Sequence, residues 1–214
     1  MALQSFSDLK TSVANWLDRS DLTDQIPDFI TLAESRISRT LRVHEMEERS
    51  QMTTIADKDH YGLPEDWLQA RHIKVVEGRG GVDRDLEYKT PEAFDIQMAR
   101  LYGASTGEPR FYTVLGNEIR YGPSPSAGKT IEILYYAKPT TLSNTNTSNT
   151  ILNNYPDIYL YAAVLEGKIY IEDNEGVMKY GKLYDQAVQN AEDSDARNQH
   201  SGGALHVSGE QFGY

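Results

Sequence analysis

Apolar residues recur at helical spacing near both ends of the chain, and the middle of the chain does not share this pattern. Residues 7–20 have apolar side chains at the spacing i, i+4, i+7, i+8, namely Leu9, Val13, Trp16 and Leu17. Ser5 and Ser7 are placed to cap a helix at its start. The segment is therefore predicted to form an amphipathic helix.

A second helical pattern covers residues 22–42. One stripe holds the apolar residues Ile26, Ile30, Ala33, Ile37 and Leu41. Pro27 falls in the first turn, where its missing N–H does no harm, and Thr23 or Asp24 can cap the helix. The opposite side carries three cations, which form either a solvated face or a docking surface: Arg36, Arg39 and Arg42.

Two more helices are predicted in residues 156–173 and 174–199. Their apolar stripes consist of Ile158, Tyr161, Ala162, Leu165 and Ile169 in the first, and of Val177, Tyr180, Tyr184, Ala187, Val188 and Ala191 in the second. Pro156 stands near the start of the first helix, and a short turn joins the two into a helical hairpin. The preceding segment 140–157, rich in Ser, Thr and Asn, is expected to be an extended, solvated connection.

The character of the chain changes near Arg49. Short β-prone runs alternate with turns, among them EGRGG at 77–81, which resembles a hairpin loop. A short helix at 90–103, with Thr90 as its cap and Pro91 in its first position, interrupts these runs. Three strands are then predicted to form an antiparallel meander: 110–116, 117–122 and 129–137.

These patterns predict an α+β fold, in which the terminal helices pack as an α-helical bundle with an inserted antiparallel β-rich domain. The predicted division places 1–48 and 150–200 in the helical domain, 49–149 in the β-rich domain with its one short helix, and 201–214 in a flexible arm. The arm is either a frayed terminus or a segment that becomes ordered on a partner. In the second case its anchors are Leu205, Val207, Phe212 and Tyr214.

Composition excludes several kinds of chemistry. The chain has no cysteine, which rules out disulfides, cysteine-ligated zinc, iron–sulfur clusters and thiol nucleophiles. Its net charge of −11 disfavours tight nonspecific binding of nucleic acid, although an acidic surface would let DNA slide past. The sequence has neither a long apolar run nor a secretion signal, so we expect no membrane span and a protein made in the cytoplasm.

The triplet Gly128-Lys129-Thr130 matches the end of a phosphate-binding loop, but its surroundings do not. Gly122 lies one residue too early for that motif, and Pro123 and Pro125 remove two of the N–H groups that would surround a phosphate. The residues after Thr130 favour a strand, whereas the motif requires a helix. Residues 122–129 are therefore predicted to form a loop between two strands, and no nucleotide or other cofactor is expected.

The catalytic case is thin. Five histidines are scattered without metal-ligand spacing, and no nucleophile elbow or dinucleotide fingerprint is present. One enzymatic alternative stays open, a cell-wall (peptidoglycan) hydrolase with a carboxylate pair across a cleft, such as Glu47 with Glu65 or Asp66. The many tyrosines in the segments expected to pack suit subunit interfaces as well as core positions.

The order of several motifs resembles that of the head-to-tail adaptor proteins of tailed bacteriophages, also described as head completion or tail tubular protein A-like proteins. The motifs are DLKTSVANWLDRSDLTDQIPDFITLAESRISRTLRVHEME, then YGLPEDWLQARHI, GNEIRYGPSP, IEILYYAKPTTLS, and LNNYPDIYLYAAVLEG before a final helix. The resemblance extends from about residue 5 to about residue 190.

This resemblance implies a structural, non-enzymatic virion component. It implies a ring of twelve subunits in the neck between capsid and tail, bound to the portal protein and to a tail tube or nozzle protein. DNA would pass through the lumen without sequence recognition during ejection. The implied portal-binding arm is 201–214, with Arg36, Arg39 and Arg42 as ring or portal contacts. The implied tail contacts lie in two loops, at Arg79 and at Ser124, Ser126 and Lys129.

Overall fold

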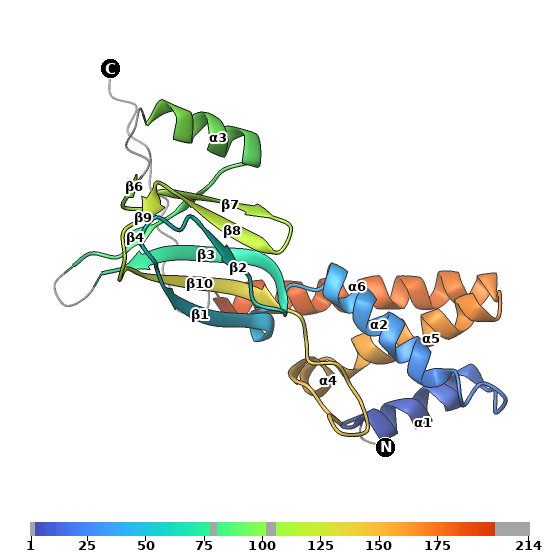
Figure 1. The fold of residues 1–214 in the computed structure, drawn as a ribbon. Helices are drawn as coiled ribbons and strands as arrows, with labels where there is room; N and C mark the ends of the chain where they lie inside the picture. The colour runs from blue at the N-terminus through green and yellow to red at the C-terminus, as the bar shows by residue number, and fades with distance from the viewer. Residues whose placement is uncertain (1–2, 78–80, 102–105, 200–214) are drawn as a thin grey trace. The chain divides into compact units, whose positions relative to one another are not determined.

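The computed structural model describes residues 3–77, 81–101 and 106–199, and the chain forms two compact units. We call them the helical unit, Met1–Val43 with Thr141–Tyr214, and the β unit, His44–Thr140. Figure 1 shows the helices of the first unit and the sheets of the second. The predicted α+β class, with terminal helices and an inserted, mainly antiparallel β region, is confirmed.

The helical unit is built around one central helix. Its helices are α1 (Phe6–Leu17), α2 (Ile26–Thr40), α4 (Thr150–Asn154), α5 (Pro156–Tyr170) and α6 (Asn174–Gln199). α5 packs against α1, α2 and α6, and eight of its fifteen residues are buried. The apolar stripes that the sequence shows on α1 and α2 are the faces that these two helices bury, with the exception of Trp16 on α1, which is exposed.

The helix starts agree with the sequence in two cases and differ in one. Ser5 caps α1, because its side chain accepts a hydrogen bond from the N–H of Asp8 at 3.1 Å. Pro156 lies in the first turn of α5 as predicted. The predicted cap of α2 by Thr23 or Asp24 is wrong: Gln25 occupies the N-cap without a side-chain bond, and the Thr23 hydroxyl donates to the carbonyl of Ser20 instead.

The connection before α5 is more ordered than predicted. Within the segment expected to be extended, residues Thr150–Asn154 form the short helix α4. The Asn149 side chain caps it by accepting from the N–H of Leu152 at 2.8 Å, and both Ile151 and Leu152 are buried. An asparagine cap ahead of two apolar residues is the signal that the Ser- and Thr-rich composition obscured.

Two close contacts hold the helical unit together. A Cβ atom at Gly167 of α5 would lie 2.8 Å from the Leu17 side chain of α1, so only glycine permits this approach. The buried carboxylate of Glu34 on α2 accepts a hydrogen bond from the backbone N–H of Leu142 at 2.7 Å. The second contact ties the connecting segment to the bundle and satisfies a buried donor.

The β unit contains two four-stranded sheets with the strand orders β1-β10-β3-β4 and β2-β8-β7-β5, and a two-stranded sheet of β6 and β9. Its strands are β1 (Glu47–Thr53), β2 (His60–Gly62), β3 (Trp67–Val76), β4 (Arg84–Asp85), β5 (Glu87–Tyr88), β6 (Thr106–Gly107), β7 (Phe111–Leu115), β8 (Glu118–Gly122), β9 (Ser124–Pro125) and β10 (Thr130–Ala137). It also includes the 3-10 helix η1 (His44–Met46) and the helix α3 (Pro91–Arg100), which Thr90 caps as predicted. The predicted hairpin loop at 77–81 lies largely outside the described residues.

The predicted meander is correct for only two of its three strands. β7 and β8 pair antiparallel, but β10 joins the other sheet, where it lies between β1 and β3. Every second side chain of β10 is buried. These side chains form one core with residues of the opposite sheet such as Tyr61 and Tyr121. The strand therefore joins the sheet in which its apolar face closes the core.

Candidate interaction surfaces

The three arginines of α2 differ in their surroundings. Arg36 donates from Nε and Nη2 to Glu166 Oε1 of α5 at 2.8 and 2.6 Å, so it joins two helices of the bundle. Arg42 donates from Nη1 to the carbonyls of Ser38 and Leu41. Arg39, in the last turn of α2, is exposed and makes no hydrogen bond or ion pair with any other described residue. Of the three candidates, Arg39 is the one available to a partner.

Three aromatic rings, one each from α1, α5 and α6, lie close together on the helical unit. Trp16 of α1 lies with its ring centroid 5.9 Å from that of Tyr161 on α5 and 6.1 Å from that of Tyr180 on α6. Trp16 remains 43% exposed, although most large apolar side chains of this unit are buried. The Lys179 ammonium lies 5.3 Å from the centre of the Tyr180 ring. We call Trp16, Tyr161 and Tyr180 the aromatic seam.

The buried residue Thr54 makes two hydrogen bonds to the backbone of the loop between β8 and β10. Thr54 donates its hydroxyl to the carbonyl of Ser126 at 2.6 Å and accepts from the N–H of Lys129 at 3.0 Å. Ser124 belongs to β9, which pairs with β6. These bonds fix the loop backbone on the β unit.

Lys129 itself is paired. Its Nζ lies 3.0 Å from a Glu77 carboxylate oxygen and 3.4 Å from one of Glu108, and the hydrogen bond to Glu77 raises the pKa of Lys129. The next residue begins a strand, as predicted from the failed phosphate-loop pattern. Among the predicted tail contacts, Arg79 lies outside the described residues, as do all four predicted anchors of the arm.

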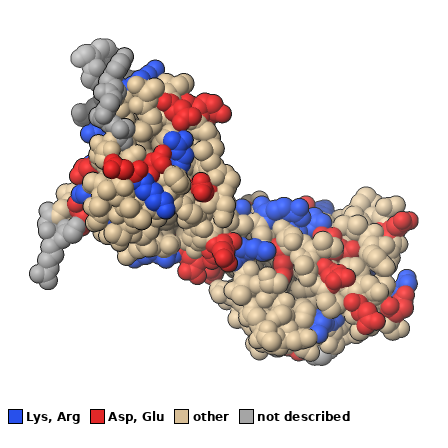
Figure 2. Space-filling view, viewed as in Figure 1, with Lys and Arg blue, Asp and Glu red and all other residues tan. Residues whose placement is uncertain are grey.

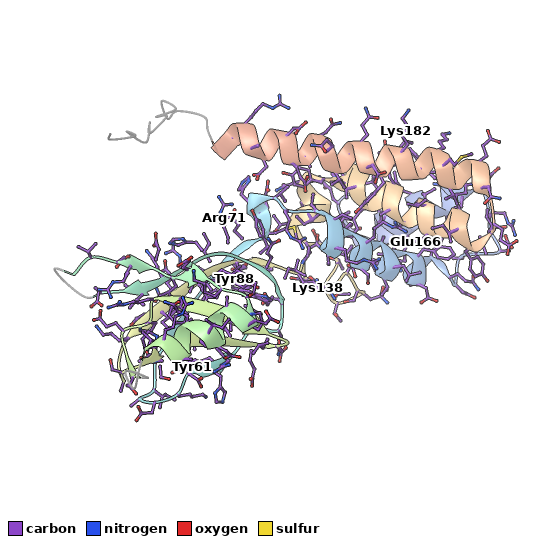
Figure 3. All side chains as sticks on the ribbon, turned by 90° about the horizontal axis from the view of Figure 1, so that it is seen from above. Tyr61, Arg71, Tyr88, Lys138, Glu166 and Lys182 are labelled. Carbon is purple, nitrogen blue, oxygen red and sulfur yellow. The ribbon has the colours of Figure 1, made fainter. Side chains whose placement is uncertain are left out.

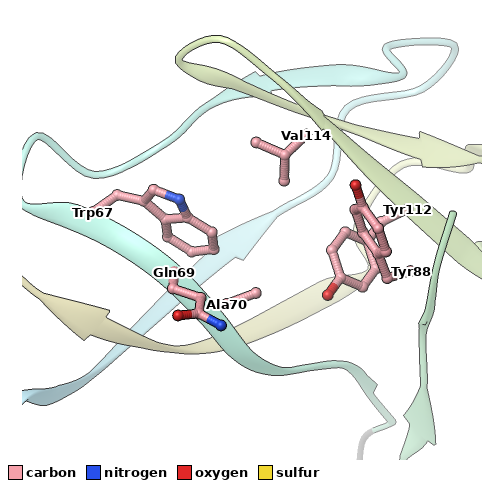
Figure 4. A pocket seen from close by; sticks show the side chains of 6 residues that line it. All are labelled: Trp67, Gln69, Ala70, Tyr88, Tyr112 and Val114. Carbon is pink, nitrogen blue, oxygen red and sulfur yellow. The ribbon is translucent and has the colours of Figure 1, made fainter. Parts of the chain in front are cut away.

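A pocket of about 400 Å³ opens between the two sheets of the β unit, and no sequence motif indicates it. Figure 4 shows its lining residues, which come from β3, β5 and β7: Trp67, Gln69, Ala70, Tyr88, Tyr112 and Val114. Trp67 stacks on Tyr135, with ring centroids 5.3 Å apart. Burial, together with the nearby Tyr88, raises the pKa of Tyr112.

The predicted hydrolase pair does not form between Glu47 and Asp66. The Arg71 guanidinium donates to Glu47 and to the Tyr136 hydroxyl, whereas the Tyr135 hydroxyl donates to Asp66 at 3.0 Å. Because neighbouring residues of a strand point to opposite faces, the two carboxylates lie on opposite sides of this sheet. Glu65, the other predicted partner of Glu47, is exposed.

The chain matches a known protein family over most of its length. A family model described as SU10 adaptor protein matches residues 4–207, a range that includes helices and strands of both units. No curated protein matches the chain. Among the helices of the described ranges, none is long and apolar enough to cross a membrane.

Proposed function

We propose, because the chain belongs to the SU10 adaptor protein family of phage head-to-tail adaptors, that it forms a ring between the portal and the tail tube or nozzle. Family membership makes the protein a structural adaptor and a virion component associated with portal and tail components. The observation that carries the proposal is the extent of the match, residues 4–207, which includes elements of both units.

The ring that we propose has twelve subunits and continues the DNA channel below the portal. The net charge of −11 supports this role, because a negatively charged lumen repels phosphates and lets DNA pass without being held. Assembly takes place in the host cytoplasm in this proposal, and DNA passes without sequence recognition.

The proposed contacts with the portal and the tail are those expected from the sequence, restricted on α2 to the arginine that is not already bonded within the described part of the chain. Residues 201–214 are proposed to bind the portal through Leu205, Val207, Phe212 and Tyr214. Arg39 is proposed as the ring or portal contact on α2, since Arg36 and Arg42 already bond within the helical unit. The loops at Arg79 and at Ser124, Ser126 and Lys129 are proposed to face tail components.

The test is the mass and the negative-stain image of the purified full chain, alone and mixed with the portal of the same phage. A ring on the portal is the expected result. A variant that ends at His200 is the matched control for the arm, and it should fail to assemble on the portal while its circular dichroism stays close to that of the full chain. A full chain that stays monomeric and does not bind the portal contradicts the proposal. Turnover of peptidoglycan is then the next assay.

A further inference from the structure

The helical unit has two exposed faces on opposite sides of α5. On one side α2 covers α5, where Phe29 lies with its ring centroid 5.4 Å from that of Tyr170. On the other side lies the aromatic seam, which includes Tyr161 of α5. Nine residues separate Tyr161 from Tyr170, about 900° of helical rotation, so the two side chains point in opposite directions. The seam and the outer surface of α2 therefore form opposite faces of this unit.

The seam face combines exposed aromatic surface with one charge of each sign. Trp16 lies within this face and is 43% exposed. Lys179 is exposed beside Tyr180, near the turn that joins α5 to α6. Asp157 is exposed in the first turn of α5, four residues before Tyr161 and therefore on the same side of the helix. Neither Lys179 nor Asp157 forms an ion pair with another described residue.

The α2 face is a single stripe with the same kinds of residue. Asp28, Leu32, Ser35 and Arg39 follow the spacing i, i+4, i+7, i+11, and all four are exposed. Leu32 is 51% exposed although it lies in the middle of a helix. Asp28 stands near the start of α2 and Arg39 near its end, and neither has an ion-pair partner in the described part of the chain.

The charges on the two faces follow a complementary order along the helix axis. α2 and α5 run antiparallel, because Phe29 meets Tyr170 near the end of α5 while Arg36 meets Glu166 one turn earlier. Asp28 therefore lies at the level of the α5–α6 turn, and Lys179 lies beyond that turn, in the second turn of α6. Arg39 lies further from that turn, beside Thr40, whose hydroxyl bonds the Tyr184 hydroxyl of α6, and Asp157 lies further still, in the first turn of α5.

We propose that the seam face of one copy packs against the α2 face of the next copy, with Lys179 opposite Asp28, Asp157 opposite Arg39, and Trp16 against Leu32. This inference rests on the proposed ring. A rotation about an axis parallel to the helices keeps their direction, so the charges of one copy meet those of the next in complementary order. Two different faces meet in this contact, which is what a closed ring requires.

A charge exchange tests the contact in the full chain. Lys179→Glu and Asp28→Lys each place like charges together, and each should lower the affinity of ring assembly roughly tenfold. The double variant restores opposite charges and should assemble like the wild type. Lys138→Glu is the matched control, because Lys138, labelled in Figure 3, is exposed in the β unit, outside both proposed faces, and its reversal should leave assembly unchanged. All variants are compared by thermal unfolding, so that loss of folding is not mistaken for loss of contact.

The absence of cysteine allows a second test. A chain with both Lys179→Cys and Asp28→Cys should form a ladder of disulfide-linked oligomers on oxidation in the presence of the portal. Each single variant should give no ladder. The two introduced residues lie on opposite faces, so a disulfide within one chain is not expected.

The outcomes separate this inference from the proposed function. A ladder together with rescue by charge exchange supports the contact. A wild-type ring whose assembly is unaffected by either single reversal, and which gives no ladder, overturns the contact but leaves the ring standing. Absence of a ring in the wild type with its portal overturns the proposed function itself.

Discussion

The two units use their charged side chains differently. Many cations of the β unit bridge carboxylates on neighbouring segments; they include Lys74, Arg84, Arg120 and Lys129. In the helical unit, Arg39, Lys179 and Lys182 form no ion pair with any residue that the structure describes. Figure 2 shows acidic and basic side chains intermixed over the β unit, and a separate basic patch over the region of α2 and α6. The helical unit thus presents charges that a neighbouring molecule can balance.

This difference concerns recognition more than stability. An exposed ion pair contributes at most about 1 kcal/mol, whereas overpacking in a core or the loss of a buried hydrogen bond costs about 1–3 kcal/mol. Each unit is therefore stabilised mainly by packing: of helices around α5 in one, and of two sheets around a tyrosine-rich core in the other. Substitutions in the two cores should have larger effects than substitutions of charges.

The largest effect is expected at Gly167, in the core of the helical unit. Val at this position would overlap the Leu17 side chain and separate α1 from α5, so Gly167→Val should lower the free energy of unfolding by about 2–3 kcal/mol. Urea unfolding followed by circular dichroism measures this change. Gly181→Val on α6 is the matched control, since no atom lies within 4 Å of its Cβ position, and it should be nearly neutral. Equal losses in both variants would show that α1 and α5 do not approach closely.

A smaller loss is expected at Glu34. Glu34→Ala leaves the buried N–H of Leu142 without its acceptor, which should cost about 1–3 kcal/mol of unfolding free energy. Glu34→Gln keeps a carbonyl oxygen at the same place and should lose clearly less. Hydrogen exchange of the Leu142 amide gives a local readout, because this amide should exchange faster in the alanine variant than in the glutamine variant. Similar protection in both would mean that Glu34 does not hold the connecting segment.

A comparable test in the β unit is Gly122→Ala. The added Cβ would overlap the Phe111 ring, which packs edge-on against Phe94 of α3, so the variant should lose about 1–2 kcal/mol. Gly62→Ala is the control, because nothing lies within 4 Å of its Cβ position. Hydrogen exchange in the Gly122→Ala variant should increase mainly in the β unit. If it increases as strongly throughout the helical unit, the two units do not unfold independently.

The sequence was sufficient for features that depend on neighbouring residues. The periodicity of 3.6 located α1, α2, α5 and α6, and the rejected phosphate loop is followed by the strand β10 as expected. The N-cap of α2 and the presence of the short helix α4 are not predicted correctly, because several Ser, Thr, Asn and Asp residues compete for cap positions within a few residues. Local competition of this kind is not resolved by residue type alone.

Features that depend on distant residues could not be predicted from the sequence. The sheet that β10 joins is determined by β1 and β3, which precede it by more than fifty residues. The sequence marks Arg36 as a docking candidate, but in the fold Arg36 bonds Glu166 of α5. The pocket lined by Trp67 and Tyr112 likewise needs strands from separate parts of the chain. In each case the sequence supplied the residue type and the fold supplied its partner.

The smallest effect is expected from the ion pairs of the β unit. Burial alone would raise the pKa of Asp59, but hydrogen bonds from His60 and Arg120 outweigh it and hold this pKa below its usual value. A carboxylate with a lowered pKa stabilises the fold above its unfolded value of about 4, and this stabilisation is lost as the pH falls through the folded value. Arg120→Met should therefore cost less than about 1 kcal/mol at pH 7, and its difference from the wild type should shrink as the pH falls below 4.

Lys182→Met in the helical unit is the control for this pH dependence. Lys182 has no ion-pair partner among the described residues, so its replacement should change the stability equally little at every pH between about 2 and about 7. This range includes the usual carboxyl pKa of about 4. Urea unfolding of the wild type and both variants across this interval gives the comparison directly. If the two variants follow the same pH profile, the ion pair of Asp59 with Arg120 does not contribute measurably to the stability of the β unit. The contrast between paired cations in the β unit and unpaired cations in the helical unit would then concern only the binding of other molecules.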